Sequence, residues 1–275
     1  MNYRHGYHAG NFADVVKHLA LITILLHLRK KDVAFAVVDS HAGRGLYDLA
    51  GEQAGKTKEA HGGITRLTGL AGGLPAALET YLALVRESGG THYPGSPLLT
   101  AKLLRPQDRL MAMEKHPEEF AALREVLSPF RNANAEHGDG YARTIKLLPP
   151  PSRRGLILID PPFEAADEFQ TLAQTISAGL RKFATGIFLV WYPVKSQAAA
   201  DAFAAEVLAG GAERVSLVDT QISAPSGKLD RAALLVINPP YEFEATMFAS
   251  ADIVAPLLAA DIAIKRLAGA DWRAG

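Results

Sequence analysis

Residues 155–163 read Gly155-Leu156-Ile157-Leu158-Ile159-Asp160-Pro161-Pro162-Phe163. The run from Leu156 to Ile159 is apolar without polar alternation, which is typical of a parallel strand covered on both faces. Two prolines then fix φ and cannot extend the hydrogen-bond ladder of a sheet, so the strand must end near Asp160. The stretch therefore predicts a buried strand that ends in a stiff corner. This corner presents a carboxylate, a backbone carbonyl and the ring of Phe163.

Predicted strands alternate with predicted helices on both sides of this stretch. The other strands are expected at residues 33–39, 110–114, 133–136, 187–191, 214–221 and 232–238, and helices at 11–30, 116–127, 168–183 and from about 197. Such alternation indicates an α/β fold with a doubly wound, Rossmann-like sheet. Turn residues separate the last two strands, which favours an antiparallel pair. We expect a mostly parallel seven-stranded sheet with a late antiparallel strand pair.

The length and hydrophobic content favour one domain. The 275 residues are 48% hydrophobic, enough for a single full core. We expect one domain over residues 1–275, beginning with an N-terminal motif segment at 1–31. Residues 46–104 interrupt the alternation of strands and helices, and we interpret them as a small helical insertion.

The composition excludes several classes of protein. Lys plus Arg and Asp plus Glu both number 29, so a nucleic-acid partner would have to bind a local basic patch rather than a basic molecule. There is no cysteine, which excludes disulfides and thiolate metal sites. The histidines show no regular spacing, and we expect no metal. The chain lacks a signal-peptide core and an apolar run of the ~20 residues that span a bilayer, so we expect a cytoplasmic protein without a membrane partner.

The residues that end the predicted strands are the candidate site, because ligands bind beyond the carboxyl ends of such sheets. After the first strand, Gly43 and Gly45 allow the backbone to approach a ligand closely. A dinucleotide fingerprint would need a third glycine where Asp48 stands, which argues against an NAD(P)-binding Rossmann oxidoreductase. Glu114 ends the second strand and is suited to accept hydrogen bonds from cofactor ribose hydroxyls. Asp139 ends the third strand and is suited to accept one from an adenine amino group; a solvated carboxylate and an Asp-Gly turn are the alternative interpretations.

The Asp160-Pro161-Pro162-Phe163 corner suits methyl transfer to an amino group on an aromatic ring. The lone pair of adenine N6 is delocalised, so the amine is a poor nucleophile. Two acceptors that hold its N–H hydrogens draw the nitrogen toward tetrahedral geometry, while a stacked ring positions the base. Asp160 can accept the departing proton, and the base must be unpaired or flipped out. We predict Asp160 as catalytic, and Pro161 and Phe163 as substrate contacts.

A second stretch, Asn238-Pro239-Pro240-Tyr241, fits the same acceptor-Pro-Pro-aromatic pattern. It follows the last predicted strand, which belongs to the antiparallel pair. The end of that strand is expected away from the switch point of the sheet, so we interpret the second stretch as structural.

Several motifs occur in order over nearly the whole chain and carry a resemblance to one family. They are Tyr3-Arg4-His5, His8-Ala9-Gly10-Asn11, Asp14, Lys17-His18, Asp39-Ser40-His41-Ala42-Gly43, Tyr93-Pro94-Gly95-Ser96-Pro97, the run from Arg153 to Pro162, and Trp191-Tyr192-Pro193. Together they resemble the bacterial ribosomal RNA large subunit methyltransferase J family, which methylates N6 of one adenine in 23S ribosomal RNA. The resemblance implies the class I fold of S-adenosylmethionine-dependent methyltransferases, with 23S ribosomal RNA as the partner.

The resemblance also implies roles for individual residues. It implies contacts with S-adenosyl-L-methionine at Lys17, His18, His41, Ser96, Glu114, Asp139 and Gly140. It implies that Asp160 is the catalytic acceptor and that Tyr3 lies near the RNA. Phe163 departs from the family, in which tyrosine is frequent at this position; stacking on a base survives the change, whereas a hydrogen bond from a phenol does not.

Other functions remain open at this point. The same chemistry serves the N6 amine of DNA adenine or the side chain of a protein glutamine, and a non-catalytic RNA-binding module is a further alternative. We expect a monomer. Arg4, Arg44, Arg153 and Arg154 are candidate phosphate contacts near the mouth of the site.

Overall fold

The computed structural model describes residues 8–51, 59–223 and 229–269. Its strands are β1 (Ala36–Asp39), β2 (Leu46–Asp48), β3 (His92–Pro94), β4 (Arg109–Glu114), β5 (Ala133–His137), β6 (Gly155–Ile159), β7 (Ile187–Pro193), β8 (Val215–Ile222), β9 (Arg231–Ile237) and β10 (Ala260–Ala268). Its α-helices are α1 (Phe12–Arg29), α3 (Ala76–Glu87), α4 (Ser96–Leu103), α5 (Pro117–Leu127), α6 (Gly140–Leu147), α7 (Glu168–Lys182), α8 (Gln197–Ala209) and α9 (Phe243–Leu258). Two short 3₁₀ helices, η2 (Glu59–Gly62) and η3 (Ile64–Leu67), precede α3.

The main sheet is parallel at its centre and antiparallel at one side. Its order is β10-β8-β9-β7-β6-β1-β4-β5. Strands β5, β4, β1, β6 and β7 are parallel neighbours, whereas β9 pairs antiparallel with both β7 and β8. The carboxyl ends of the parallel strands therefore meet at one edge of the sheet, where a ligand site is expected.

The predicted count of seven strands is wrong, because the described part of the chain has eight strands in this sheet. The additional strand is β10, which pairs antiparallel with β8 at the edge. Its residues alternate between half-buried and exposed rather than forming a buried apolar run. The two strands predicted to form the late pair, β8 and β9, are antiparallel as expected.

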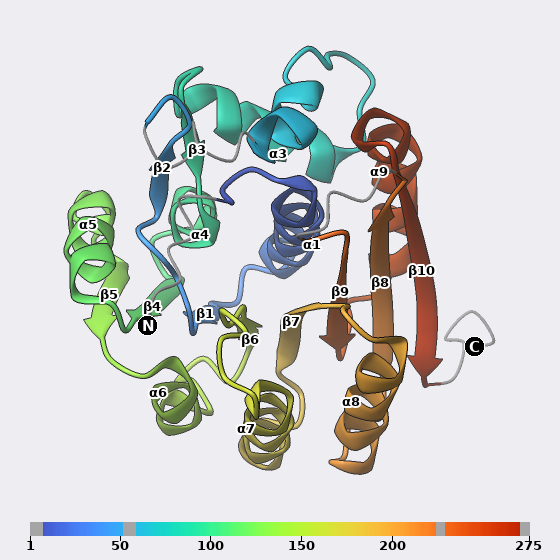
Figure 1. Ribbon diagram of the computed structural model, residues 1–275. Coiled ribbons are helices and arrows are strands. Elements are labelled where there is room, and N and C mark those ends of the chain that lie inside the picture. Colours follow the sequence, from blue (N-terminus) through green and yellow to red (C-terminus); the bar gives the residue numbers. More distant parts are fainter. Residues whose placement is uncertain (1–7, 52–58, 224–228, 270–275) are drawn as a thin grey trace.

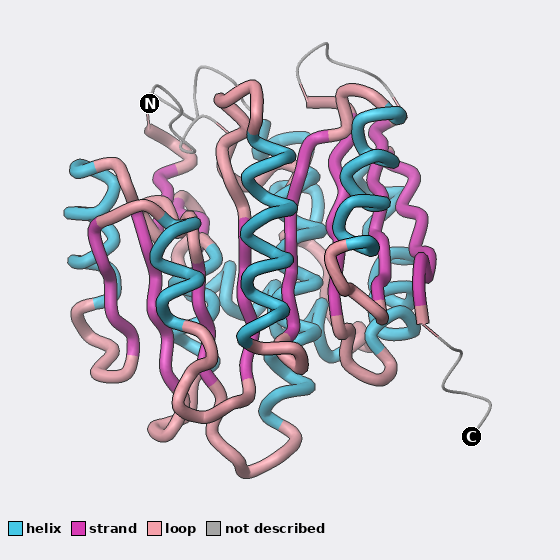
Figure 2. The backbone as a smooth tube through the Cα atoms, turned by 90° about the horizontal axis from the view of Figure 1, so that it is seen from below, coloured by secondary structure: helices cyan, strands magenta, loops and turns pink. Residues whose placement is uncertain are grey.

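Helices cover both faces of the sheet (Figure 1), with α1, α4, α5 and α9 on one face and α6, α7 and α8 on the other. Figure 2, seen from below, shows the second group in front of the strands. A separate apolar cluster fills each side, as the burial of Val15 and Leu158 in one and of Ile157 and Ile176 in the other illustrates. The three layers bury the sheet on both faces, which agrees with the apolar run of β6.

Helix α1 is buried on nearly all sides. Every residue from Phe12 to Leu25 is buried. The helix lies between the sheet and α3, and it also contacts α4 and α9. The side chain of Asn11 caps its N-terminus by accepting a hydrogen bond from the Asp14 N–H at 2.9 Å. Polar side chains in the middle of α1 are therefore held inside the protein.

The region from residue 46 to 104 contains strands as well as helices. Strands β2 and β3 form a separate antiparallel ribbon. Between them, within the described residues, lie η2, η3 and α3, and α4 follows β3 directly. Helix α3 packs against α1 on the side away from the sheet (Figure 1), and this brings β3 and the start of α4 toward the middle of α1.

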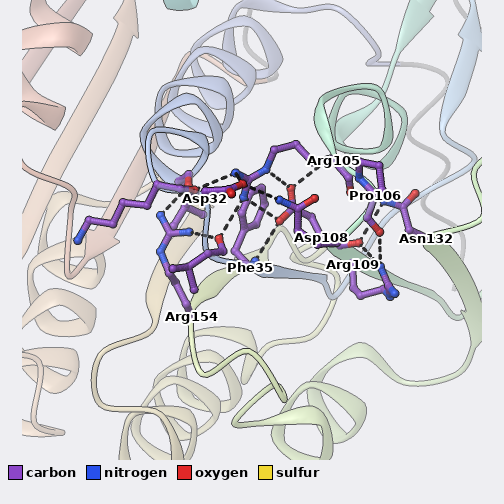
Figure 3. Close-up of polar contacts among 12 residues, drawn as sticks. Asp32, Phe35, Arg105, Pro106, Asp108, Arg109, Asn132 and Arg154 are labelled. Atoms are coloured by element: carbon purple, nitrogen blue, oxygen red, sulfur yellow. Dashed lines mark hydrogen bonds and ion pairs between the residues drawn. The ribbon is translucent and has the colours of Figure 1, made fainter.

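An arginine cluster holds together the loops at the opposite, amino edge of the sheet (Figure 3). Asp108 is fully buried and accepts hydrogen bonds from the Phe35 N–H and from the guanidinium of Arg105. The guanidinium groups of Arg105 and Arg154 lie 5.5 and 5.9 Å from the centroid of the Phe35 ring. Arg154 also donates to the carbonyls of Leu28 and Val33. Arg154 thus joins the segments before β6 and β1, at the edge of the sheet away from the carboxyl ends of the parallel strands. Arg153 precedes it at the same edge. The predicted position of these two arginines near the mouth of the site is therefore wrong.

Candidate active site

A cavity of about 430 Å³ opens at the carboxyl ends of β1, β4, β5 and β6. Ligand sites are typically concave and of this order of size. The predicted site residues that line it come from α1, from the strand ends and from the start of α4. They are Lys17, His18, His41, Ser96, Glu114, Asp139, Gly140, Asp160 and Pro161. Of the other two predicted residues, Tyr3 lies outside the described residues, and Phe163 does not line the cavity.

Asp160 is held by a lysine from α1. Its Oδ2 atom lies 2.5 Å from Lys17 Nζ, and Lys17 Nζ also donates to Asp14 Oδ1 at 2.7 Å. Lys17 and Asp14 are buried, and the Asp160 side chain is 16% exposed. Burial alone would lower the pKa of Lys17, but the carboxylates of Asp14 and Asp160 outweigh burial and raise the pKa above its ordinary value. The lysine is therefore a charged ammonium that fixes one oxygen of Asp160.

A second buried carboxylate, Asp39, ends β1 behind the cavity wall. Ser96 Oγ donates to Asp39 Oδ2 at 2.7 Å, and Asp39 Oδ1 has no hydrogen-bond partner among the described residues. Burial raises the pKa of Asp39 to about 7, although the hydrogen bond from Ser96 acts in the opposite direction. Since the hydroxyl hydrogen of Ser96 is used by Asp39, its oxygen lone pairs remain to accept a hydrogen bond from a ligand in the cavity.

Histidine 18 lies in a buried polar chain that reaches away from the cavity. His18 Nδ1 lies 2.6 Å from the hydroxyl of Tyr93, and this hydroxyl lies 2.8 Å from that of Tyr81. The rings of His18 and Tyr93 are also stacked, with centroids 5.5 Å apart. Burial raises the pKa of both phenols, so they stay protonated. These contacts fix one edge of the imidazole ring.

His41 lies in the loop after β1 and is neutral near pH 7. Burial lowers its pKa to about 4, despite the nearby charges of Asp160 and Asp139. Its Nδ1 lies 2.7 Å from Ser40 Oγ, and its ring meets Tyr141 edge-on with centroids 4.8 Å apart. A neutral ring at this point adds no positive charge to the cavity.

Glu114 and Asp139 follow adjacent strands and are both held by backbone N–H groups. Glu114 accepts from Gly43 N at 2.9 Å and from His116 N at 2.7 Å, and burial raises its pKa. Asp139 caps α6 by accepting from Ala142 N, and it pairs with Lys115 at 3.1 Å. Burial would raise the pKa of Asp139, but these two partners hold it below its ordinary value. Both carboxylates are fixed in position and keep lone pairs for a ligand.

The loop glycines are needed for close backbone packing at the site. A Cβ atom at Gly140 would overlap the carbonyl oxygen of Ser40, so only glycine allows α6 to start against the end of β1. Gly43 has φ +61° and donates its N–H to Glu114, a conformation that favours glycine. Both glycines therefore shape the cavity wall rather than offering flexibility.

Phe163 follows the double proline and packs against other aromatic rings. Its centroid lies 4.9 Å from that of Phe169 and 6.0 Å from that of Trp191, both edge-on. The ring is half-buried, and its chain neighbours Pro162 and Glu164 both line the cavity. Phe163 thus stands beside the cavity and not inside it.

The second acceptor-Pro-Pro-aromatic stretch lies at the other edge of the sheet. It follows β9, which is antiparallel to β7, so its position corresponds to the amino end of β7. Asn238 Nδ2 donates to the carbonyls of Ala184 and Gly186 in the turn before β7. Asn238 fastens this turn, in agreement with the structural interpretation.

Two polar pairs at the site have members that were not predicted as site residues. Asp14 was not predicted as a site residue: its ion-pair partner is Lys17, three positions later on α1, and only the fold brings Asp160 to the same lysine. Tyr141 donates to Glu168 Oε1 at 2.6 Å, and both side chains line the cavity between α6 and α7. Tyr141 directly follows Gly140, so extending the Asp139-Gly140 motif by one residue would have found it.

Two kinds of feature are missing from the part of the chain that the structure describes. Within residues 8–51, 59–223 and 229–269, no three His, Asp or Glu side chains are grouped so that they could bind a metal ion. Over the same residues, the helices are too short or too polar for a membrane crossing.

The sheet order, the antiparallel β9 inserted beside the last parallel strand, and the cavity at the carboxyl edge define a class I S-adenosylmethionine-dependent methyltransferase. Residues 32–272 match the sequence model of the family described as ribosomal RNA large subunit methyltransferase D, RlmJ. The chain belongs to this family of ribosomal RNA large subunit methyltransferases.

Relatives and a solved structure agree with this assignment. The chain is 38% identical over 253 residues to ribosomal RNA large subunit methyltransferase J of Escherichia coli K12, covering 90% of each chain. It is 35% identical over 254 residues to the protein of the same name from Haemophilus influenzae, again covering 90% of each. The crystal structure of protein LPL1258 from Legionella pneumophila superposes with a TM-score of 0.87 at 31% identity, covering 94% of this chain and 98% of that one.

Proposed function

We propose that this protein transfers the methyl group of S-adenosylmethionine to N6 of an adenine in 23S ribosomal RNA. The observation that carries the proposal is the position of the Asp160-Pro161-Pro162 corner, which borders the same cavity as Glu114 and Asp139. Membership of a ribosomal RNA large subunit methyltransferase family supports the RNA substrate. Methyl transfer to DNA adenine or to a protein glutamine is the alternative that the same corner would serve.

The cavity residues fit S-adenosylmethionine. Glu114 and Asp139 offer fixed acceptors at the ends of adjacent strands, suited to the ribose hydroxyls and to the adenine amino group. Ser96 offers an oxygen acceptor, and His41 is neutral, so neither opposes the positive charge of the cofactor. When bound, S-adenosylmethionine supplies a methyl group activated by the sulfonium. Lys17, His18 and Gly140 complete the proposed contacts.

The chemistry proposed for Asp160 follows from its two oxygens. Oδ2 is engaged by Lys17, and Oδ1 accepts no hydrogen bond from the described residues. In the proposed mechanism, Oδ1 and the Pro161 carbonyl accept the two N–H hydrogens of N6. This pair of acceptors localises the nitrogen lone pair toward the methyl carbon. As the new C–N bond forms, N6 becomes cationic, and one of its protons passes to Oδ1 or to solvent.

The substrate must present a single unpaired or flipped adenine. Phe163 stands beside the cavity, where its half-buried ring is available for stacking on that base. Tyr3 is proposed to lie near the RNA on the family resemblance alone. We also propose that the enzyme acts as a monomer, in the cytoplasm where ribosomes assemble.

The proposal is tested by methyl incorporation into 23S ribosomal RNA transcribed in vitro. With labelled S-adenosylmethionine, the wild-type protein should yield N6-methyladenosine, detected by mass spectrometry of the nucleosides. Asp160→Asn should lower kcat by at least about 100-fold, because the acceptor of the N6 proton is lost. Its affinity for the cofactor should change much less.

Asp167→Asn is the matched control, since Asp167 is an exposed carboxylate in the same loop that does not line the cavity. This variant should keep the wild-type rate. Duplex DNA and a glutamine-containing release factor serve as competing substrates. Faster methylation of either one, or a near-native rate for Asp160→Asn, would overturn the proposed function.

A further inference from the structure

The buried contacts of Lys17 form a chain from the N-terminal turn to the proposed catalytic carboxylate. Lys17 Nζ lies 2.7 Å from Asp14 Oδ1 and 2.5 Å from Asp160 Oδ2. The side chains of Lys17 and Asp14 are only 5% and 2% exposed. One ammonium is thus shared by two carboxylates in a place where water screens little.

Asp14 is held in place independently of Lys17. Its Oδ2 accepts the Gly10 N–H at 2.9 Å, and its own N–H donates to Asn11 Oδ1. It lies in the first turn of α1, where the helix dipole favours a negative charge. The turn itself is fastened to the next segment, since Asn11 donates to Glu59 and the Ile64 N–H donates to the Gly10 carbonyl. Asp14 is therefore a fixed negative charge beside Lys17.

From this geometry we infer that Asp14 is a positioning residue of the reaction: it balances the charge of Lys17, so that Lys17 can hold Asp160 without neutralising it. With Asp14 present, the buried group of Asp14, Lys17 and Asp160 carries one net negative charge. Without it, Lys17 and Asp160 would form a neutral pair. The inference rests on the proposed function, because the role given to this negative charge is to stabilise the positive charge that forms on N6.

The net negative charge acts where the reaction creates positive charge. The N6 lone pair forms a bond to the methyl carbon while the carbon–sulfur bond breaks and its electron pair stays on sulfur. Sulfur becomes neutral, and N6 holds the positive charge until a proton leaves it. Fixed opposite charge at a developing charge is among the largest contributions to catalysis, because no reorganisation is needed during the step.

Other ionisable groups also face Lys17. Asp39 at the end of β1 and Tyr81 on α3 both interact electrostatically with Lys17, and Tyr93 on β3 interacts with Asp14. Neither Tyr81 nor Tyr93 carries charge near pH 7, since burial raises the pKa of each phenol. Among the described residues, only Asp14 and Asp160 form direct ion pairs with Lys17, so they are the two groups whose removal must be compared.

The test is Asp14→Asn, which removes the charge and keeps an oxygen for the Gly10 N–H. We expect kcat on 23S ribosomal RNA to fall about 10- to 100-fold, with the KM values for RNA and S-adenosylmethionine nearly unchanged, as for loss of an interaction made in the transition state. The wild-type kcat should stay level to about pH 10, because Lys17 keeps its proton and its ion pair with Asp160. In Asp14→Asn the loss of rate in alkaline solution should begin at a lower pH than in wild type, because one of the two carboxylates that raise the pKa of Lys17 is gone and deprotonated Lys17 no longer holds Asp160 in position. Asp14→Glu should recover part of the rate.

Asp108→Asn is the matched control (Figure 3). Asp108 is also a buried carboxylate that pairs with a cation three positions away, Arg105, but it lies at the other edge of the sheet. Rates are expressed per mole of protein that binds S-adenosylhomocysteine, which corrects for loss of folded enzyme. On this basis Asp108→Asn should keep the wild-type kcat and pH profile.

The outcomes separate the inference from the proposed function. A wild-type enzyme that methylates 23S ribosomal RNA, together with an Asp14→Asn variant of native kcat and pH profile, would overturn the inference alone. Equal losses in Asp14→Asn and Asp108→Asn would also overturn it. A wild-type enzyme that leaves adenine N6 unmethylated would overturn the proposed function.

Discussion

One oxygen of Asp39 accepts a hydrogen bond, and the other is buried without a hydrogen-bond partner among the described residues. Burial raises its pKa to about 7 from the ordinary value of 3.8. Between these two values the folded protein keeps a proton that the unfolded chain has released, so the free energy of unfolding should fall as pH rises through this window. The amide of an Asp39→Asn variant does not titrate in this range, so the variant lacks this pH dependence of the free energy of unfolding. In urea titrations from about pH 4 to pH 7, wild type should lose stability relative to the variant, by a few kcal/mol at most.

Asp108 supplies a control of opposite sign for this prediction. Burial acts to raise the pKa of Asp108, but Arg105 and two backbone N–H groups hold it below the ordinary value. The stability that Asp108 contributes is therefore present above pH 4 and is lost as pH falls below it. If the stability difference between wild type and Asp39→Asn did not vary with pH, the buried Asp39 carboxylate would not titrate as described.

At the scale of single elements, α1 is both a core element and the carrier of Lys17 and His18. Ile24 in this helix is fully buried, whereas Phe248 on α9 is 58% exposed. Ile24→Ala should lower the free energy of unfolding by about 2–5 kcal/mol, because it leaves a cavity in a closely packed region. Phe248→Ala should cost less than about 1 kcal/mol. Urea denaturation of both variants checks this, and equal costs would show that α1 packs more loosely than described.

The elements also show what the sequence could predict. The apolar runs of β6 and β7 and the carboxylates that follow β4, β5 and β6 were sufficient to place most of the site, because parallel strands bring their carboxyl ends to one edge. Strand β10 was missed, since it is half-exposed and carries no such run. The full burial of α1 depends on α3 and α9, which cover it from distant parts of the chain. Spacing along one helix cannot reveal such covering elements, nor that Asp160 lies beside the pair of Asp14 and Lys17.

At the scale of the whole molecule, the charges are balanced and largely paired near the site. The formal net charge is zero. Arg44 pairs with Glu119, and Lys115 pairs with Asp139, so these cations are not available as phosphate contacts without losing their partners. We expect the affinity for ribosomal RNA to depend only weakly on salt, with a log–log slope shallower than that of proteins that neutralise about 6–10 phosphates. Filter binding from about 50 to 300 mM KCl measures it, and a slope steeper than about −6 would contradict this expectation.

The contact between α1 and the end of β6 has a consequence during synthesis. Lys17 leaves the ribosome long before Asp160, and β1 needs both β4 and β6 as neighbours before the centre of the sheet exists. Until then Lys17 has one of its two described ion-pair partners, Asp14, and complete burial of α1 would leave the ammonium without the second carboxylate. A nascent chain shorter than about 160 residues should therefore leave this helix undocked and accessible to chaperones or proteases. The first helix would then dock in the same folding step that brings Lys17 to Asp160.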